Sequence, residues 1–391
     1  MKSVLFNTHD LVLIFTIYIC LFFALYLVTL KKGKKISNYL LALFLLTQAA
    51  IPLDNLIDYG EVFKSVALDI SPNLFYSFGL AYWLEAPLLL LYVRSLSYKN
   101  FKVTLKDGIY FLPFILFSLY FIDGWLLLDN EIKIAAIQGN TIEQTPTFDR
   151  IIHIIRAVLR FVFGILCLKE LHRYQKHIKN QVSDIENVDL TWLKILVIGF
   201  LVIRTNAIFI AIAIAFSYEI GISIDHEILG LTSNYVVLFL LTTLIFFSAG
   251  YSTIFNGIDS KLDNLKDDET TLAFSPEEIE LIEKYMENNK PQLNQLLTLD
   301  GLASQLAMSP RNLSLIINRH FEKNFFEFIN HYRIEESKKL LESAENRKTT
   351  MLDVMANSGF NSKATFNTFF KKLVGVTPTE YRKQFWQKAQ N

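Results

Sequence analysis

Six of the ionisable side chains inside long apolar segments of the first 254 residues are candidates for a functional site. They are Glu85, Asp123, His153, Arg156, Arg160 and Arg204. A charge at the centre of a bilayer costs at least about 2–3 kcal/mol, so such side chains usually face other helices or a wet cavity. His153, Arg156 and Arg160 are spaced three and four apart, which places them on one helix face. Two interpretations stay open: an anion-binding pocket that opens to the outside, or ion pairs between helices, for example Glu85 or Asp123 with the arginines.

A second set of polar side chains lies near the C-terminus, on the outer faces of two short helices that apolar spacing predicts. Leu313, Ile316 and Ile317 point inward on the first helix, and Phe366, Phe369 and Phe370 on the second. The outward residues are Arg311, Asn312, Ser314, Leu315 and Asn318, then Lys363, Thr365, Asn367 and Thr368. Each helix is the second member of a predicted helix-turn-helix unit, whose exposed N-terminal half reads base edges in the major groove.

Seven apolar segments must position the first set. They are Leu11–Leu30, Asn38–Ile57, Leu74–Leu96, Gly108–Leu128, Ile151–Leu168, Leu193–Phe216 and Leu231–Ile254. A bilayer core needs roughly 20 helical residues, and these segments are about that long. A soluble core could bury one such helix, but not seven in a row. The first segment ends in Lys31–Lys35 rather than in small residues, so we interpret it as a retained span and not as a cleaved signal peptide.

The loop charges predict the orientation of these spans. Three alternate loops, within residues 31–35, 94–106 and 169–194, hold 13 Lys and Arg residues. The opposite loops hold few basic residues and many Asp and Glu. Because Lys and Arg accumulate in cytoplasmic loops, the N-terminus is predicted to lie outside and everything after residue 254 in the cytoplasm. The predicted location is therefore a membrane that the chain crosses several times.

The remaining sequence divides into a cytoplasmic linker, residues 255–274, and a small domain, residues 275–391. Helix-capping residues recur in the domain, at Ser275, Thr298, Ser309, Thr350 and Thr377. No segment alternates with the period of a strand. The predicted fold class is therefore all-α: a seven-helix transmembrane bundle, residues 1–254, followed by a domain of about seven short helices that contains two helix-turn-helix units.

The C-terminal domain resembles the DNA-binding domain of the AraC/XylS family of bacterial transcriptional regulators. The similarity is carried by TLDGLASQLAMSPRNLSLIINRHF at 298–321, FFEFINHYRIEESKKLL at 325–341 and GFNSKATFNTFFKKLVGVTPTEYRK at 359–383. It implies seven helices, a linker helix between the two units, and recognition helices in adjacent major-groove segments. It also adds Ala364 to the second reading surface. The chain departs from the family at Glu322, where Gly is frequent, and at Thr368, where Arg is frequent and could contact guanine.

These features favour a one-component regulator in which the membrane bundle senses a signal and the tethered domain binds DNA. The expected partners are double-stranded promoter DNA, membrane lipid, an unknown ligand, RNA polymerase by family resemblance, and a second copy in a homodimer. The alternative is a transporter or permease with a cytoplasmic regulatory tail. An enzyme is not expected, because the sequence lacks H-E-x-x-H, G-x-S-x-G and a phosphate-binding Gly loop. With two cysteines in apolar segments, neither a metal site nor a cofactor is expected.

Overall fold

A computed structural model describes residues 7–29, 34–138, 147–185, 188–220, 226–251, 275–345 and 348–388. The described residues form two compact units. The first comprises residues up to 172 together with those from 190 onward before the linker, and the second comprises residues 173–189 together with the C-terminal helices. The predicted boundaries at residues 254 and 274 lie outside the described residues.

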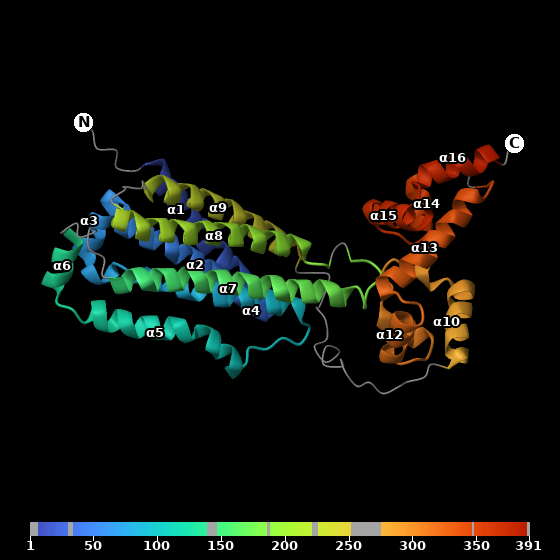
Figure 1. Cartoon of the computed structure of the whole chain (residues 1–391), viewed down its shortest axis with the longest axis horizontal. Helices are drawn as coiled ribbons and strands as arrows, with labels where there is room; N and C mark the ends of the chain where they lie inside the picture. The colour runs from blue at the N-terminus through green and yellow to red at the C-terminus, as the bar shows by residue number, and fades with distance from the viewer. Residues whose placement is uncertain are drawn as a thin grey trace. The chain divides into compact units, whose positions relative to one another are not determined.

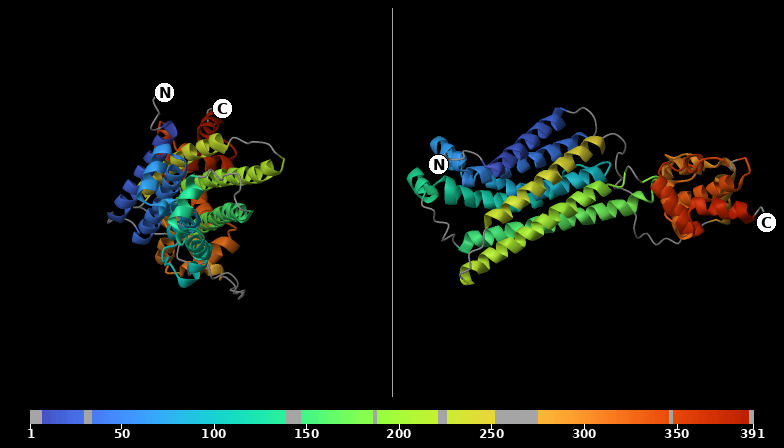
Figure 2. Two further views of the ribbon diagram at one scale, coloured as in Figure 1. Left: turned by 90° about the vertical axis from the view of Figure 1, so that its left-hand side faces the viewer. Right: turned by 90° about the horizontal axis from the view of Figure 1, so that it is seen from above.

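The first unit is a bundle of helices that run along its length (Figure 1). The long helices are α1 (Thr8–Thr29), α2 (Lys35–Tyr59), α4 (Ala81–Ser97), α7 (Thr147–Ile178), α8 (Thr191–Ile220) and α9 (His226–Tyr251), and the shorter ones are α3 (Glu61–Ile70), α5 (Leu112–Phe121) and α6 (Asn130–Gln138). Helix α2 packs between α1 and α4, and α9 contacts both α1 and α8. The further views in Figure 2 show the same lengthwise packing.

Five segments are long and apolar enough to cross a membrane by length and composition. They are Thr8–Thr29, Lys35–Tyr59, Pro72–Ser97, Leu105–Leu126 and Ile151–Ile178. Helices α8 and α9 coincide with the sixth and seventh predicted spans, but many of their side chains lie outside the described set. The count of seven therefore stays a prediction.

The fourth predicted span is not one regular helix. Its chain passes from a 3₁₀ segment, Leu105–Phe111, through α5 into a π-helical turn, Ile122–Leu126. Pro113 lies in the first turn of α5, where its missing N–H costs no helical hydrogen bond. A proline there also prevents the preceding turn from continuing as α-helix. Apolar composition predicted the segment, and Pro113 accounts for the boundary between the 3₁₀ segment and α5.

The second unit contains the seven short helices that the sequence predicts. They are α10 (Pro276–Asn289), α11 (Leu299–Gln305), α12 (Pro310–Arg319), α13 (Phe325–Glu342), α14 (Met351–Asn357), α15 (Lys363–Val374) and α16 (Pro378–Lys388). The predicted caps at Ser275, Thr298, Ser309 and Thr350 are confirmed, since each hydroxyl accepts a hydrogen bond from a backbone N–H of the following turn. The regular elements among the described residues are helices, and an isolated antiparallel bridge joins Val182 to Thr298.

Helix α13 carries two separate hydrophobic cores. Its first half contributes Phe325, Phe328 and Ile329 to a core with α10, α11 and α12. Ile334 and Leu341 belong to a second core with α14 and α15. Figure 1 shows α10 and α12 beside one end of α13, and α14, α15 and α16 beside the other. One helix therefore joins the two helix-turn-helix units.

Residues 173–189, which the sequence placed in the membrane domain, group with the C-terminal helices in the structure. The physical reason is a set of hydrogen bonds that no local pattern encodes. The backbone N–H of Ser183 donates to Leu297 O, and the N–H of Phe326 donates to Lys179 O. The loop that follows α7 is thus part of the second unit.

Candidate DNA-binding surface and buried charge cluster

The two helix-turn-helix units repeat the same backbone devices. Thr298 caps α11 and Thr350 caps α14. Each first helix is followed by a residue with positive φ, Ala307 at 54° and Gly359 at 88°. Ser309 and Ser362 then cap the second helices by accepting from the backbone N–H three residues later. This repetition sets α12 and α15 at equivalent places in their units.

Gly359 is required at its turn for two reasons. Its φ of 88° is strained for any residue with a Cβ. A Cβ there would also lie 2.5 Å from Gln292 O and 2.9 Å from Leu293 Cα. The backbone of the α10–α11 connection therefore approaches the second turn as closely as a glycine allows.

Glu322, where the resembled family often has glycine, has a φ of 52°. The left-handed conformation costs a residue with a side chain about 1–2 kcal/mol. The turn between α12 and α13 thus keeps the backbone that glycine would favour, and the departure noted in the sequence is a point of strain.

The predicted base-reading residues of the first unit lie on α12 but differ in exposure and in hydrogen bonding. Arg311 and Asn318 are exposed, while Ser314 and Leu315 are half-buried. Asn312 is not a free reading side chain, because its amide donates to Glu278 Oε1 at 2.6 Å and so ties α12 to α10.

The predicted residues of the second unit form a more open surface. Lys363, Ala364, Asn367 and Thr368 are exposed on α15, and Thr365 is half-buried. The opposite face of α15 is buried through its three phenylalanines. An exposed polar N-terminal half on a well-packed helix is what groove recognition needs.

Glu85 is the centre of a buried charge cluster in the first unit. It is 2% exposed and lies on α4. Arg160 of α7 forms an ion pair with it, and Arg204 of α8 approaches it at 2.9 Å. Gln48 of α2 donates to its other oxygen at 2.8 Å. Four helices therefore meet at one carboxylate, which satisfies the rule that a buried charge is paired and hydrogen-bonded.

The other predicted members lie apart from that carboxylate. The Arg156 guanidinium stacks 4.3 Å from the Tyr82 ring centroid and donates to His153 Nδ1 at 2.8 Å. Asp123 is exposed on the π-helical turn and, among the described residues, forms no ion pair with these arginines. Sequence reasoning missed Gln48, since an amide in an apolar segment carries no charge signal.

A cavity of about 30 Å³ adjoins the cluster, lined by Glu85, Arg160, Arg204, Cys167 and apolar side chains. Such a volume holds one or two water molecules. Pockets for small organic ligands are roughly ten times larger or more. In this conformation the charged groups are therefore arranged as interhelical ion pairs beside a small cavity.

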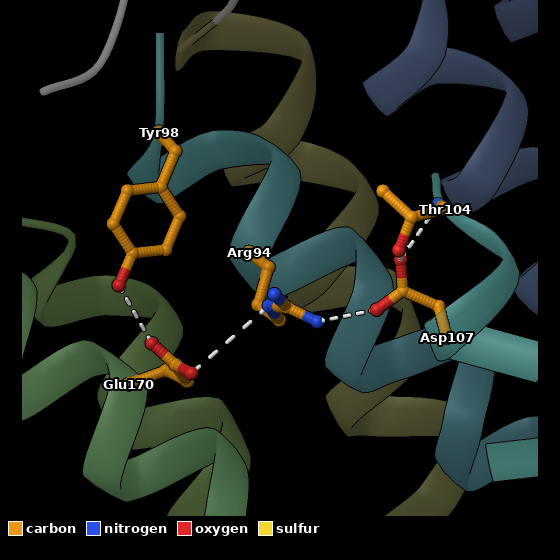
Figure 3. A network of polar contacts seen from close by, with 5 residues as sticks. All are labelled: Arg94, Tyr98, Thr104, Asp107 and Glu170. Atoms are coloured by element: carbon orange, nitrogen blue, oxygen red, sulfur yellow. Dashed lines mark hydrogen bonds and ion pairs between the residues drawn. The ribbon is translucent and has the colours of Figure 1, made fainter. Parts of the chain in front are cut away.

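A second polar network ties α4 to α7 (Figure 3). Arg94 forms an ion pair with Asp107 at 2.7 Å and approaches Glu170 at 4.0 Å. The Tyr98 hydroxyl donates to the second oxygen of Glu170 at 2.9 Å. Thr104 donates to Asp107 through its backbone N–H and its hydroxyl. Helix α7 is thus held by charge at Arg160 and again at Glu170.

Residues 302–384 match the family described as a helix-turn-helix domain. The chain is similar to the uncharacterized HTH-type transcriptional regulator YtdP of Bacillus subtilis, with 32% identity over 88 residues, which is 22% of this chain and 11% of the relative. It is also similar to the melibiose operon regulatory protein of Escherichia coli, with 28% identity over 97 residues, 25% of this chain and 31% of the relative.

A third relative is the putative HTH-type transcriptional regulator YkgA of Escherichia coli, 26% identical over 110 residues, 28% of this chain and 45% of the relative. The chain thus spans less than half the length of each of these curated relatives. No solved structure matches it. The matches and the two repeated units support an AraC-type helix-turn-helix domain at the C-terminus. The chain carries a DNA-binding domain of the kind found in transcriptional regulators.

Proposed function

We propose that this protein is a membrane-embedded, one-component transcriptional regulator. The tethered domain binds promoter DNA through α12 and α15, and a signal acting on the seven-span bundle modulates that binding. One observation carries the proposal: two equivalently capped helix-turn-helix units, joined by α13, present exposed polar residues on their second helices, within the segment that matches the family. The protein acts by binding rather than by catalysis.

Exposed apolar surface supports the membrane assignment. Large side chains such as Leu25 on α1, Leu119 on α5 and Phe246 on α9 are more than half exposed. Soluble proteins rarely leave large contiguous patches of this kind uncovered. With the loop charges, this favours a bundle that crosses the bacterial inner membrane with the C-terminal domain in the cytoplasm. Lipid, RNA polymerase and a second copy of the chain are the further proposed partners.

The six ionisable residues of the spans are proposed as the place where the signal acts. Glu85, Arg160 and Arg204 form a paired cluster whose rearrangement would move α4, α7 and α8 against one another. A signal can shift such a bundle only if it favours one of two arrangements over the other. An anionic ligand that competes with Glu85 for the arginines would do so.

Genome-wide DNA crosslinking of the full-length protein tests the output. Enriched sites with a shared sequence of two adjacent segments are expected. The full chain in lipid nanodiscs should then bind that sequence with an affinity that falls steeply with salt, as phosphate contacts require. Binding with the same salt dependence but no sequence preference would refute a regulator.

Single substitutions assign the reading residues. Arg311→Ala and Lys363→Ala should each weaken specific binding by about 1–3 kcal/mol if they contact bases. Lys284→Ala is the matched control, because Lys284 is an exposed lysine on α10 and not on a recognition helix, and its ion pair with Glu280 is exposed. Equal effects of all three variants would contradict the assignment.

A further inference from the structure

Residues 179–185 follow α7, begin with the turn that closes that helix, and lie against the C-terminal helices through an isolated bridge at Val182. The N–H of Ser183 donates to Leu297 O at 3.1 Å, and the N–H of Leu299 donates to Gln181 O at 2.9 Å. These two bonds frame the antiparallel bridge between Val182 and Thr298. We call residues 179–185 the docking strand.

The docking strand supplies acceptors to a buried arginine. Arg333 lies near the middle of α13 and is 2% exposed. Its guanidinium donates to Ser183 O at 3.0 Å and Ser183 Oγ at 3.1 Å. It also donates to Gln292 O at 2.8 Å and Asn294 O at 2.9 Å. Burial lowers the pKa of Arg333 to about 10, which still leaves it charged at neutral pH.

A buried charge is tolerated only where its donors are satisfied. Ser183 provides two of the acceptors of Arg333 and is itself 1% exposed. Without residues 179–185 the guanidinium keeps acceptors at Gln292, Asn294 and Asn330 but loses its two hydrogen bonds to Ser183. The docking strand completes the domain.

The docking strand contacts both helix-turn-helix units. Leu297 and Leu299, which bond to it, belong to the core of the first unit. Ile185 packs on the core of the second unit. Asn361, in the second turn, donates to Asp184 at 3.3 Å. A single seven-residue segment therefore spans the junction that fixes one unit against the other.

The ends of the docking strand are also held. The Tyr174 hydroxyl, in the last turns of α7, donates to Val188 O at 2.5 Å, and the Gln175 amide donates to Asp189 O at 3.0 Å. The chain leaving the strand is thus bound back to the helix that enters it. The same helix, α7, carries Arg160 and Glu170, so the docking strand is covalently continuous with the helix that bears these charged residues.

We propose that the docking strand is an intramolecular interaction surface that locks the two helix-turn-helix units in the arrangement that binds DNA, and that α7 acts on the domain through it rather than through the linker at 255–274. The inference rests on the proposed regulatory function. In this proposal two separate connections join the domain to the bundle: α7 with the docking strand, and the linker at 255–274. Locking the two units improves binding to a two-segment site, because less orientational freedom is lost on binding.

A disulfide tests the docking itself in the full chain. Val182 and Thr298 form the pair that is not directly hydrogen-bonded in an antiparallel bridge, with Cα atoms about 4.5 Å apart, a spacing that a disulfide can span. Val182→Cys with Thr298→Cys is made in nanodiscs, together with a protease site in the 255–274 linker. The native cysteines, Cys20 and Cys167, are both buried.

After oxidation and linker cleavage, most of the double variant should run as one band without reductant and as two with it. The control pair, Val182→Cys with Leu296→Cys, is out of register by two residues and should crosslink at least tenfold less. Equal crosslinking of the two pairs overturns the docking. Oxidation should leave the affinity for the two-segment DNA within twofold of the reduced protein, and a loss above fivefold overturns the claim that the docked state binds DNA.

Undocking is tested with Ser183→Pro, which removes the N–H donor to Leu297, against Ser183→Ala, which keeps it. Ser183→Pro should lower affinity for the two-segment site at least tenfold and for a single segment less than twofold. An unchanged affinity for the two-segment site overturns the proposal. A raised affinity also overturns it and would indicate that the strand inhibits DNA binding. If the unmodified protein binds no specific DNA, the regulatory function fails, whereas the crosslink still decides whether the strand docks.

Discussion

Replacing Arg333 by methionine removes the guanidinium at the junction of the two helix-turn-helix units while keeping an unbranched side chain. The substitution deletes four hydrogen bonds of 2.8–3.1 Å, two to Ser183, one to Gln292 and one to Asn294. Three backbone carbonyls then lose a buried donor. A hydrogen bond to a charged group contributes about 1.5–3 kcal/mol, and an unsatisfied buried acceptor costs about 1–3 kcal/mol.

These contributions do not add fully, because methionine fills part of the space and water can reach some of the carbonyls. Breaking a buried charged network by removing one partner costs about 3–5 kcal/mol in measured cases. We expect a loss within that range. It should appear as exchange of the Ser183, Leu299 and Phe326 amides that is at least about a hundredfold faster, since 1.4 kcal/mol is tenfold in an equilibrium constant.

Hydrogen exchange of the full chain in nanodiscs, followed by mass spectrometry of peptides, measures this loss. Lys338→Met is the matched control: it removes a long basic side chain from the same helix, but the ion pair of Lys338 with Glu335 is partly exposed. Such pairs contribute about 0–1 kcal/mol. Similar exchange in the two variants would refute the role given to Arg333.

Four further substitutions have defined outcomes. Gly359→Ala should destabilise the domain by more than about 3 kcal/mol, because it adds a steric clash to an unfavourable φ. Hydrogen exchange of the amides in α14 and α15 measures this loss. Glu322→Gly should stabilise the domain by about 1 kcal/mol, as measured by the same exchange, since it relieves the φ of 52°. Glu85→Gln should lower the melting temperature of the first unit, because two buried arginines lose their counter-charge. Desolvation lowers the pKa of His331 in the folded protein, so the unfolded state binds a proton more readily. The free energy of unfolding therefore falls as the pH drops below about 6.5. His331→Gln should make that fall smaller between pH 7 and 5, as measured by unfolding at each pH.

Each of these has a control on the same chain. Gly375 has a φ of 87° with open space around it, so Gly375→Ala reports strain without the clash. Glu322→Ala also removes the Glu side chain but does not relieve the positive φ. An equal gain in stability from Glu322→Ala would show that the gain at that site is not conformational. Asp123→Asn, at an exposed carboxylate, is the control for Glu85→Gln. His320→Gln, at an exposed histidine, is the control for His331→Gln. Equal effects within any pair contradict the corresponding reasoning.

The seven C-terminal helices could be predicted because their signals are local. A cap such as Ser309 and apolar residues such as Leu313 and Ile316 lie within one or two turns of one another, and the structure places them as the spacing implies. The same locality predicted which faces of α12 and α15 are buried. It did not predict that Asn312 would bond to Glu278, since that contact joins helices 34 residues apart.

In the first unit, the types of residue in the charge cluster were predictable and the pairing was not. A carboxylate and arginines in apolar segments must find partners, and Glu85 with Arg160 and Arg204 satisfies that rule. Asp123 was an equal candidate by sequence. The break of its helix into a π-helical turn leaves it exposed, and that break depends on geometry that composition does not encode.

The contact between Ser183 and Arg333 joins positions 150 residues apart, and this separation has a consequence during synthesis. A ribosome that adds about 5–20 residues per second needs roughly 8–30 s to travel that distance. Over this interval the backbone groups of residues 179–185 lack the C-terminal partners with which they form hydrogen bonds, and such an edge can pair with a neighbouring nascent chain. A message cut short after the last apolar helix would leave that edge permanently open, so truncated products should be prone to aggregation and to removal by proteases.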